Sequence, residues 1–551
     1  MIVYHATKAQ FSQDVFNDEI DTKILYFFTE NIGRSTSKSE IASWRNSLGY
    51  MERVLQDPAI PADCGVALEY QIPQSGKRLD FILTGIGADN AQYAILVELK
   101  QWETSRLSEQ DAIVYAFVGG RERETVHPSY QAWSYAELLR NFNESVETDN
   151  IELNPCAYLH NYSADDVIKN EHYKSYIQKA PLFLRGEAAD LQAFIKKYIR
   201  YGDNGSVLYK IENGKIRPSK MLAESLVSML RGNQEFIMID DQKLVFETAM
   251  QMVKKGRLGR KKVLVVQGGP GTGKSVVAIN LLVEITKLGL LTQYVSKNGA
   301  PRAVYLHKLT GTRIKGVSAN LFKGSGSYIN TAVNQFDALI VDEAHRLNKH
   351  SGLFNNLGEN QIKEIINAAV CSIFFIDDDQ KVTLKDIGSR DTIKQWASVY
   401  DAEIIELELS SQFRCNGSDG YLAWIDHTLQ IRETANTTLD GINYEFKVFE
   451  SATALRDAII EKNSINNKAR LVAGYCWDWK SKKSASAYDI IIERDGFKMR
   501  WNLQSDGGLW IVSRESVNEI GCIHTSQGLE VDYVGVIIGE DLIVRDGELV
   551  T

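Results

Sequence analysis

The chain has 551 residues, of which 44% are hydrophobic and 24% charged, and its formal net charge at pH 7 is −9. This length exceeds what a single hydrophobic core usually holds, so we expect three or four domain-sized units. The composition excludes a globally disordered chain. Because the net charge is negative, a polyanion would have to bind at a local basic surface.

The cysteines and the apolar segments predict a cellular location. The six cysteines are far apart and form no C-x-x-C pair, so neither a zinc knuckle nor a disulfide framework is indicated. No segment approaches the roughly 18 apolar residues of a membrane span, and the N-terminus lacks a secretory pattern. We therefore expect a cytoplasmic protein with no membrane partner.

Residues 1–187 are expected to form one domain. Its expected elements, in chain order, are a helix around 37–55, strands at 67–72, 78–84 and 93–99, and a helix around 129–142. Apolar segments at 154–162 and 180–186 extend this α-β-β-β-α module. The polar, mostly helical residues 188–232 are expected to form a connector.

Three short, unbroken apolar runs organise the next part of the chain. They are VLVV at 263–266, ALIV at 338–341 and SIFFI at 372–376. Non-alternating strands with helical stretches between them predict a parallel sheet covered on both faces, with ligand groups at the carboxyl ends of the strands. We assign this first α/β domain to residues 233–395.

A second set of strand-like runs predicts another α/β domain over residues 396–551. The runs are EIIELEL at 403–409, ARLVAGY at 469–475, GLWIV at 508–512 and YVGVIIG at 533–539.

The sequence GGPGTGKS directly follows the VLVV run and precedes a helical stretch, which is the pattern and the context of a phosphate-binding loop. Gly268, Gly271 and Gly273 would let successive backbone N–H groups converge on phosphate oxygens. Lys274 would reach the β- and γ-phosphates, and Ser275 would ligate Mg²⁺. The pattern predicts a binding site for ATP.

Acidic residues follow the other two strands of this sheet. Asp342 and Glu343 end the ALIV run, and Asp377 and Gln380 follow the SIFFI run. One carboxylate can hold the Mg²⁺ shell, and the next can orient or deprotonate the water that attacks the γ-phosphate. Together with the phosphate-binding loop, these acids predict ATP hydrolysis.

These sequences together resemble the motor core of superfamily 1 helicases, which contains two RecA-like domains. The resemblance extends from about residue 235 to 539 and includes the DDDQ sequence that ends at Gln380. It implies that Gln242 contacts the adenine and that Gln380 senses the γ-phosphate. It also implies that Arg414, in SSQFRCN, contacts the γ-phosphate.

Two further segments carry the same resemblance. SKNGAPRAVY at 296–305 resembles the strand-contacting motif Ia, and IHTSQGLEVDYVGV at 523–536 is similar to the fifth motif. Bacterial helicase-like proteins whose motor resembles that of long Schlafen proteins are the nearest relatives that these motifs suggest. No sixth-motif arginine follows before Thr551, so we expect slow ATP hydrolysis by this chain alone. Truncation, a partner subunit or self-association would account for the missing motif.

The N-terminal part contains a second candidate site. Asp80 lies in one expected strand, and Glu98-Leu99-Lys100 ends the next. Because side chains alternate along a strand, Glu98 and Lys100 face the same side. Asp80, Glu98 and the Leu99 carbonyl offer the hard oxygen ligands that Mg²⁺ prefers, with Lys100 near the attacking water or the phosphoryl charge. The pattern predicts phosphodiester hydrolysis.

This arrangement resembles the PD-(D/E)XK nuclease superfamily, and the α-β-β-β-α order agrees with its core. On the following helix, Gln131 and Tyr135 form the Q-x-x-x-Y sequence of RecB-type nucleases, and the four-residue spacing places both on one face. The resemblance implies Mg²⁺ or Mn²⁺ at this site, with Glu40 as an additional metal ligand. Glu69 is a weaker candidate.

The sequence thus predicts an α/β protein in which a PD-(D/E)XK nuclease fold precedes two RecA-like P-loop domains. We expect a Mg²⁺-dependent nuclease coupled to an ATP-driven helicase or translocase that acts on DNA, in DNA repair or anti-phage defence. One alternative is a nucleotide-controlled nuclease that processes RNA. Another is a non-catalytic ATP-dependent switch that only binds nucleic acid.

Overall fold

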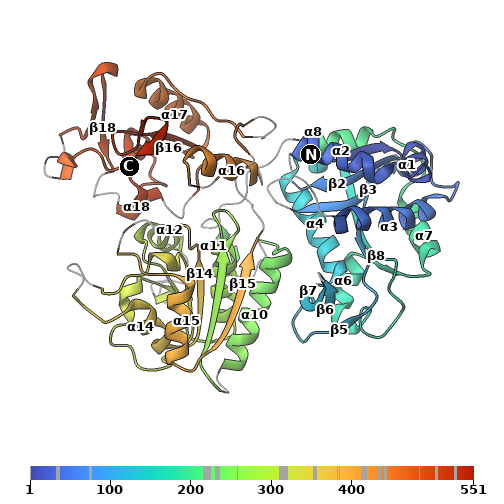
Figure 1. Cartoon of the computed structure of the whole chain (residues 1–551), viewed down its shortest axis with the longest axis horizontal. Helices are drawn as coiled ribbons and strands as arrows, with labels where there is room; N and C mark the ends of the chain where they lie inside the picture. The colour runs from blue at the N-terminus through green and yellow to red at the C-terminus, as the bar shows by residue number, and fades with distance from the viewer. Residues whose placement is uncertain are drawn as a thin grey trace.

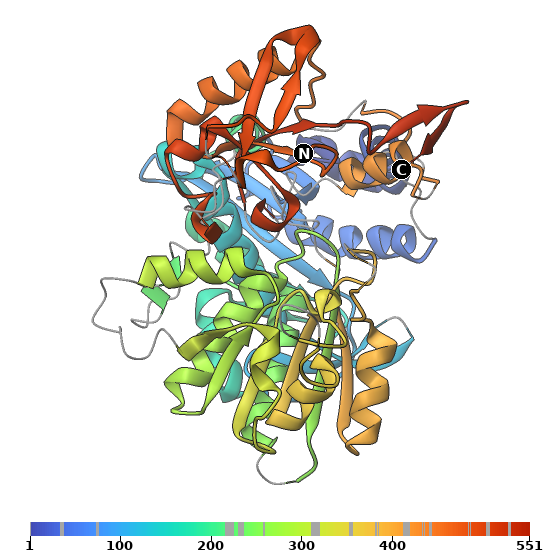
Figure 2. The ribbon, with the colours of Figure 1, turned by 90° about the vertical axis from the view of Figure 1, so that its left-hand side faces the viewer.

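The computed structural model shows an N-terminal unit, a central lobe and a C-terminal lobe (Figure 1). The C-terminal lobe lies above the central lobe in both ribbon views (Figures 1 and 2). The residues that the structure describes are 2–32, 38–72, 77–118, 120–214, 225–226, 228–229, 236–256, 259–309, 320–351, 356–380, 383, 385–410, 419–431, 433–434, 436–439, 444–482, 484, 486–502, 507–526 and 530–550.

A six-stranded mixed sheet forms the centre of the N-terminal unit. Its order is β1-β2-β3-β4-β8-β9, antiparallel from β1 to β4 and parallel from β4 to β9. The strands are β1 (Tyr4–Thr7), β2 (Gly65–Gln71), β3 (Arg78–Ile86), β4 (Gln92–Lys100), β8 (Ile151–Leu159) and β9 (Leu182–Leu184). The central strands are buried on both faces, which agrees with their nearly unbroken apolar sequences.

Helices cover both faces of this sheet. One face packs against α1 (Lys8–Phe16), α2 (Ile20–Ile32), α3 (Lys38–Leu55) and α7 (Ala188–Tyr198). The other face packs against α4 (Pro128–Phe142), α5 (Glu144–Thr148) and α8 (Ser206–Asn213). The described part of the expected connector 188–232 therefore contributes α7 and α8 to the cores of the N-terminal unit, because Leu191 and Ile195 on α7 and Val207 and Ile211 on α8 are buried there.

The helix expected at 37–55, the three strands after it and the helix at 129–142 are all present. The expected order was incomplete, because β1, α1 and α2 precede α3. A small antiparallel sheet of β5 (Ser105–Leu107), β6 (Ile113–Val118) and β7 (Arg121–Val126) is inserted between β4 and α4. A short helix, α6 (Lys174–Lys179), packs against α4. The domain boundaries themselves stay predictions.

The central lobe is the expected parallel α/β unit. Its sheet has the order β12-β11-β13-β14-β10-β15, and every neighbouring pair is parallel. The strands are β10 (Lys262–Gly268), β11 (Thr292–Val295), β12 (Phe322–Lys323), β13 (Phe336–Val341), β14 (Ala369–Ile376) and β15 (Glu403–Leu409). One face is covered by α10 (Asp240–Gly256), α11 (Lys274–Lys287) and α12 (Gly299–Leu309), and the other by α14 (Gln361–Ala368) and α15 (Arg390–Val399).

One strand lies in a different sheet from the one that the sequence predicts. The run at 403–409 was expected in the second α/β domain, but it forms β15 and pairs in parallel with β10. Seven residue pairs, from Lys262↔Glu403 to Gly268↔Leu409, fix this register. The strand that leads into the phosphate-binding loop therefore has a neighbour on each side, and the central sheet extends beyond residue 395.

The C-terminal lobe contains a five-stranded sheet with the order β17-β18-β19-β16-β20. The strands are β16 (Ala469–Ala473), β17 (Ile490–Ile492), β18 (Phe497–Trp501), β19 (Glu519–Gly521) and β20 (Tyr533–Ile537). The lobe also contains α16 (Asp419–Thr428), α17 (Ala452–Asn466), α18 (Ile523–Ser526) and a hairpin of β21 (Ile543–Arg545) and β22 (Glu548–Val550). The strands expected at 469–475 and 533–539 correspond to β16 and β20.

The strand expected at 508–512 is wrong. These residues form a short 3₁₀ helix, Gly507–Leu509, followed by a turn. Trp510 and Ile511 are buried in the apolar core of the central lobe, and a Cβ on Gly508 would come within 2.6 Å of Ala303 Cβ on α12. The apolar run therefore docks the C-terminal lobe onto the central lobe instead of entering a sheet.

No helix in the described ranges is long and apolar enough to cross a membrane. The cysteines in the described part of the chain are all free and comprise Cys64, Cys156, Cys371, Cys476 and Cys522.

We predict that Arg470→Met destabilises the C-terminal lobe by about 3 kcal/mol, because a buried hydrogen-bonded cation leaves its acceptors without partners when it is removed. Arg470 is 1% exposed, and its guanidinium donates to the carbonyls of Ile511 and Ser513 at 2.8 Å each. Denaturant unfolding followed by tryptophan fluorescence measures the effect. The control Arg494→Met removes a side chain that is 81% exposed and should change stability by less than about 0.5 kcal/mol. Equal midpoints for the two variants would contradict the prediction.

Candidate nucleotide site and metal centre

The phosphate-binding loop connects β10 to α11, as the sequence predicts. Gly271 and Gly273 adopt positive φ angles of 76° and 86°, a conformation that glycine adopts without strain. A Cβ on Gly268 would come within 2.6 Å of Thr272 Oγ1. The loop therefore requires its glycines, and α11 begins directly after it at Lys274.

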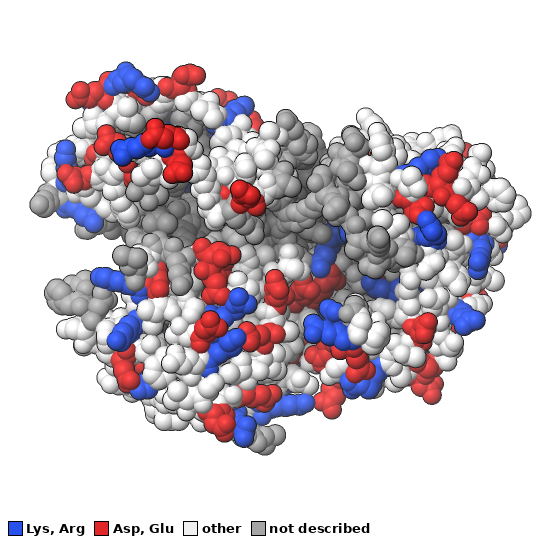
Figure 3. All heavy atoms as spheres, viewed as in Figure 1, with Lys and Arg blue, Asp and Glu red and all other residues white. Residues whose placement is uncertain are grey.

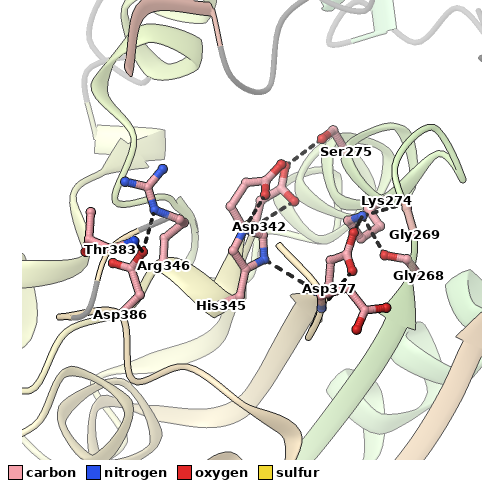
Figure 4. Close-up of polar contacts among 12 residues, drawn as sticks. Gly268, Gly269, Lys274, Ser275, Asp342, His345, Arg346, Asp377, Thr383 and Asp386 are labelled. Atoms are coloured by element: carbon pink, nitrogen blue, oxygen red, sulfur yellow. Dashed lines mark hydrogen bonds and ion pairs between the residues drawn. The ribbon is translucent and has the colours of Figure 1, made fainter. Parts of the chain in front are cut away.

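Lys274 is held inside this loop. Its Nζ donates to the carbonyl oxygens of Gly268 and Gly269 at 2.6 and 2.8 Å and lies 3.9 Å from Asp377 Oδ2 (Figure 4). Lys274 is 7% exposed. A buried ammonium group at the start of a helix, beside a glycine-rich loop, is suited to phosphate oxygens.

The expected magnesium ligands of the nucleotide site lie side by side. Ser275 Oγ donates to Asp342 Oδ2 at 2.7 Å, and the Tyr294 hydroxyl donates to the same oxygen at 2.6 Å. Burial, and then the charge of Glu343, raise the pKa of Asp342. A buried carboxylate with a raised pKa is stabilised by a cation, so Ser275 and Asp342 fit a Mg²⁺ ion that accompanies a nucleotide.

A buried histidine links the two acidic strand ends. His345 Nε2 lies 3.0 Å from Glu343 Oε2, and His345 Nδ1 accepts from the Asp377 backbone N–H at 3.4 Å (Figure 4). This acceptor role places the ring proton on Nε2, which faces Glu343. Glu343 itself has a positive φ of 54°. The histidine therefore lies between the two acidic strand ends, with Nε2 beside the carboxylate that is expected to orient the attacking water.

Of the three other residues predicted at the nucleotide site, the structure describes the two glutamines and not the arginine. Gln242 is buried, and its Nε2 donates to the Thr272 carbonyl of the phosphate-binding loop at 3.2 Å. Gln380 is half-buried, and its backbone N–H donates to the Asp377 carbonyl at 3.1 Å. Arg414 lies outside the described residues.

The N-terminal candidate site lies where β3 begins and β4 ends. Phe81 pairs with Val97, so Asp80 and Glu98 stand opposite each other one position further along. Asp80 Oδ2 accepts from the Leu99 backbone N–H at 2.8 Å, and Lys100 Nζ lies 2.7 Å from Glu98 Oε1. Glu98 and Lys100 therefore contact each other, as the strand alternation predicts.

The electrostatics of this pair favour a cation. Burial, and then the neighbouring Asp80 carboxylate, raise the pKa of Glu98 to about 8, and burial also raises the pKa of Asp80. Burial lowers the pKa of Lys100, but the charges of Glu98 and Asp80 outweigh this effect and the net shift is upward. Glu98 Oε2 is buried and has no hydrogen-bond partner among the described residues. A divalent cation between the two carboxylates would satisfy that oxygen and replace a proton.

The other predicted nuclease residues occupy different positions. Gln131 Nε2 donates to the Tyr135 hydroxyl at 3.0 Å, so both residues share one face of α4. Glu69 is engaged elsewhere, because Trp44 Nε1 donates to its Oε1 at 2.7 Å and Arg78 lies 3.0 Å from its Oε2. The side chain of Glu40, on α3, lies outside the described residues.

Within the described residues, no cluster of three or more His, Cys, Asp or Glu side chains has metal-binding geometry. A metal ion at the N-terminal site would therefore be held by Asp80 and Glu98 with the Leu99 carbonyl and water. This set suits Mg²⁺, which usually keeps several waters and binds through one or two carboxylates.

Two cavities adjoin these sites. One of about 310 Å³ lies beside Asp80 and is lined by residues that include Trp44, Lys77 and Arg78. The other, of about 540 Å³, lies at the predicted motif Ia segment; its lining residues are Lys297, Asn298, Gly299, Arg346, Asn348, Thr383 and Lys385. Buried Asp386 holds two of these cations, at 2.9 Å from Lys297 Nζ and 3.1 Å from Arg346 Nε (Figure 4).

Sequence reasoning missed several residues of both sites. Tyr294 supports Asp342 from β11, and His345 links Glu343 to Asp377. Asp240 accepts the Tyr135 hydroxyl at 2.6 Å from a different unit of the fold. The DEAH sequence contains His345 and could have suggested it, but no local pattern connects the other two residues to their partners.

The fold and the loop geometry define a P-loop ATPase. Residues 261–551 match the family described as Schlafen group 3, DNA/RNA helicase domain. Because the match covers more than half of the chain, the protein belongs to this family. The expectation of a helicase-like motor is confirmed, whereas the nuclease interpretation of the N-terminal unit lies before the matched residues and stays a prediction.

One curated relative and two solved structures are also similar to the chain. The uncharacterized protein YPL245W of Saccharomyces cerevisiae is 26% identical over 316 residues, which cover 51% of this chain and 68% of that protein. A DNA replication initiation factor is 17% identical with a TM-score of 0.20, covering 43% of this chain and 64% of its own. The Sulfolobus solfataricus SWI2/SNF2 ATPase core in complex with dsDNA is 10% identical with a TM-score of 0.21, covering 54% and 87%. Structural similarities of this size carry no functional argument.

We predict that Lys274→Ala weakens ATP binding by about 10- to 100-fold, since a charge-assisted hydrogen bond contributes about 1.5–3 kcal/mol. Glu343→Gln should keep the affinity but slow turnover by about 100-fold, because the amide cannot accept a proton from water. Calorimetric titration measures binding, and phosphate release measures turnover. The control Lys287→Ala changes a lysine at the far end of α11 that pairs with Glu284. Wild-type ATP affinity in Lys274→Ala would refute the assignment of the loop.

We predict that Mg²⁺ or Mn²⁺ binding at the N-terminal site strengthens as the pH rises to about 8 and levels off above it. Below the raised pKa of Glu98 the metal must displace a proton, so the affinity should rise by up to about tenfold per pH unit. Because the pKa of Glu98 is raised in the folded state, the metal-free fold should lose stability as the pH rises from the ordinary pKa of glutamate to about 8. Calorimetry without nucleotide, in buffers of different ionisation enthalpy, measures affinity and proton release. A pH-independent affinity in the wild type, or an unchanged profile in Glu98→Gln, would count against this site.

Proposed function

We propose that the chain is a metal-dependent nuclease whose N-terminal site works with the ATP-driven superfamily 1 motor of its central and C-terminal lobes. The observation that carries the proposal is the pair of buried carboxylates, Asp80 and Glu98, with Lys100 beside them at the ends of two central strands. Gln131 and Tyr135 on α4 support it. We place this activity on DNA, in repair or anti-phage defence.

The chemistry follows from the roles that these residues can take. A divalent ion held by Asp80 and Glu98 would polarise a phosphodiester and lower the pKa of a bound water. Lys100 neutralises Glu98 and can stabilise negative charge that develops on the phosphoryl group. The Asp80 carboxylate is oriented by the Leu99 backbone N–H, which leaves its second oxygen for other ligands.

Nucleic acid would reach the motor at local basic surfaces. Basic and acidic side chains are interspersed over the face shown in Figure 3, and neither sign forms a continuous band among the residues coloured there. The cavity at the motif Ia segment instead gathers Lys297, Arg346 and Lys385. Phosphate contacts of this kind fix position without reading the base sequence.

RNA is the second candidate substrate. The family to which the chain belongs is described as a DNA/RNA helicase domain, so the motor does not by itself select DNA. The cavity beside Asp80 has Lys77 and Arg78 in its lining, and cations of this kind can contact the phosphates of either polymer.

We predict that Glu98→Ala, Lys100→Ala and Asp80→Asn each lower cleavage by at least about 100-fold, because each removes a metal ligand or the cation that neutralises one. The assay follows cutting of matched labelled DNA and RNA with Mg²⁺ or Mn²⁺, with and without ATP. Glu152→Ala is the matched control, since Glu152 is an exposed acid on β8 that pairs with Tyr93 of β4. Undiminished cleavage by the Glu98 and Lys100 variants, or no cleavage of either substrate by the wild type, would refute the nuclease.

A further inference from the structure

Asp240, the first residue of α10, contacts the candidate nuclease site from the other side of a domain boundary. Its Oδ2 accepts the Tyr135 hydroxyl at 2.6 Å and lies 3.1 Å from Lys77 Nζ. Tyr135 in turn accepts a hydrogen bond from Gln131. Asp240 Oδ1 is buried and has no partner among the described residues. A carboxylate from the helix that precedes the motor strands thus fixes the tyrosine of the Q-x-x-x-Y pair.

The next two residues of α10 contact the motor. Gln242 Nε2 donates to the Thr272 carbonyl of the phosphate-binding loop at 3.2 Å. Asp241 Oδ2 accepts from Ser410 Oγ at 2.5 Å, directly after the end of β15. One helical turn therefore bonds to the nuclease site, the phosphate-binding loop and the chain that leaves the central sheet.

The rest of α10 is attached to both units along its length. On its outer side, Lys243 Nζ lies 2.8 Å from Asp111 Oδ2, and Gln110 Nε2 donates to Gln251 Oε1 at 3.2 Å. Its inner apolar side chains, among them Val245 and Met252, belong to the core of the central lobe. Figure 1 shows α10 at the edge of that lobe, beside the N-terminal unit. Because α10 is held on both sides, the residues of its first turn move together, and a displacement of one of them displaces the others.

We propose that Asp240 is a positioning residue of the nuclease site, and that the first turn of α10 couples this site to the phosphate-binding loop so that nucleotide binding changes the cleavage rate. The effect on cleavage rests on the proposed nuclease function. The linkage itself does not, because it joins two binding sites through hydrogen bonds made by one helix.

Nucleotide binding must disturb the contacts that this linkage uses. In the structure Lys274 donates to the Gly268 and Gly269 carbonyls, and phosphate oxygens would compete for that ammonium. An adenine would compete for the Gln242 amide, which here holds the Thr272 carbonyl. Any ligand that changes the position of Gln242 also changes that of Asp240, two residues away. By linkage, if nucleotide changes the affinity of the nuclease site for its ligand, that ligand must change nucleotide affinity by the same factor. A substitution that breaks the bond between Tyr135 and Asp240 would shift the same equilibrium.

Single-turnover cleavage tests the coupling on the full chain. The probe is a labelled oligonucleotide that the wild type cuts, with and without a non-hydrolysable ATP analogue. We expect the two wild-type rates to differ by about fivefold or more, and the ratio to fall to within about twofold of unity in Asp240→Asn and in Gln242→Ala. Gln251→Ala removes another bond between α10 and the N-terminal unit and should keep the wild-type ratio. Equal wild-type rates, or wild-type ratios in both test variants, would overturn the coupling.

A binding measurement decides the linkage whether or not the chain cuts. Affinity for a fluorescent ATP analogue is compared in the wild type, Tyr135→Phe, Asp240→Asn and Gln251→Ala, after circular dichroism has shown that each is folded. We expect shifts of about threefold or more in the first two variants and none in Gln251→Ala. A wild type that cuts nothing but shows these shifts refutes the nuclease and retains the linkage. Affinities within about twofold of wild type in both Tyr135→Phe and Asp240→Asn refute the linkage.

Discussion

A carboxylate that leaves water must receive a proton, a cation or several hydrogen bonds, and both candidate sites are organised by this requirement. Asp80 and Glu98 lie opposite each other in a buried sheet, and Asp342 lies at the end of another. Lys100, from the same strand as Glu98, and Lys274, beside the phosphate-binding loop, offset part of this charge. The two sites are thus regions of the fold where negative charge gathers in a low-dielectric interior, and a divalent ion would relieve the imbalance in each.

Local sequence predicted the parts of these sites that depend on one strand or one turn. Unbroken apolar runs located the central strands, because parallel strands buried on both faces contain few polar residues. The glycine pattern located the phosphate-binding loop, since its backbone angles exclude most other residues. Strand alternation predicted the contact of Glu98 with Lys100, and helical spacing predicted that of Gln131 with Tyr135.

The features that no local pattern could predict depend on contacts between distant segments. The run at 403–409 reads as a strand in either sheet, and only its tertiary pairing places it beside β10. The apolar residues at 508–512 satisfy a strand pattern equally well, but they are buried against another lobe. Asp240 meets Tyr135 across 105 positions of sequence, and neither residue carries a local signal of the other. Without an alignment, one sequence cannot distinguish such a contact from a solvated acid.

The burial of Trp510 has a mechanical consequence for the motor. Its indole belongs by sequence to the C-terminal lobe but by packing to the central lobe, and a Cβ on Gly521 would come within 2.3 Å of its ring. Two lobes that share a side chain in this way cannot rotate freely past one another. Separation would expose a large aromatic surface to water, at a free-energy cost of a few kcal/mol. Trp510 therefore holds the two lobes together. Any movement of one lobe relative to the other must either carry Trp510 along or release it from the central lobe. The fluorescence of this tryptophan would therefore follow such a movement.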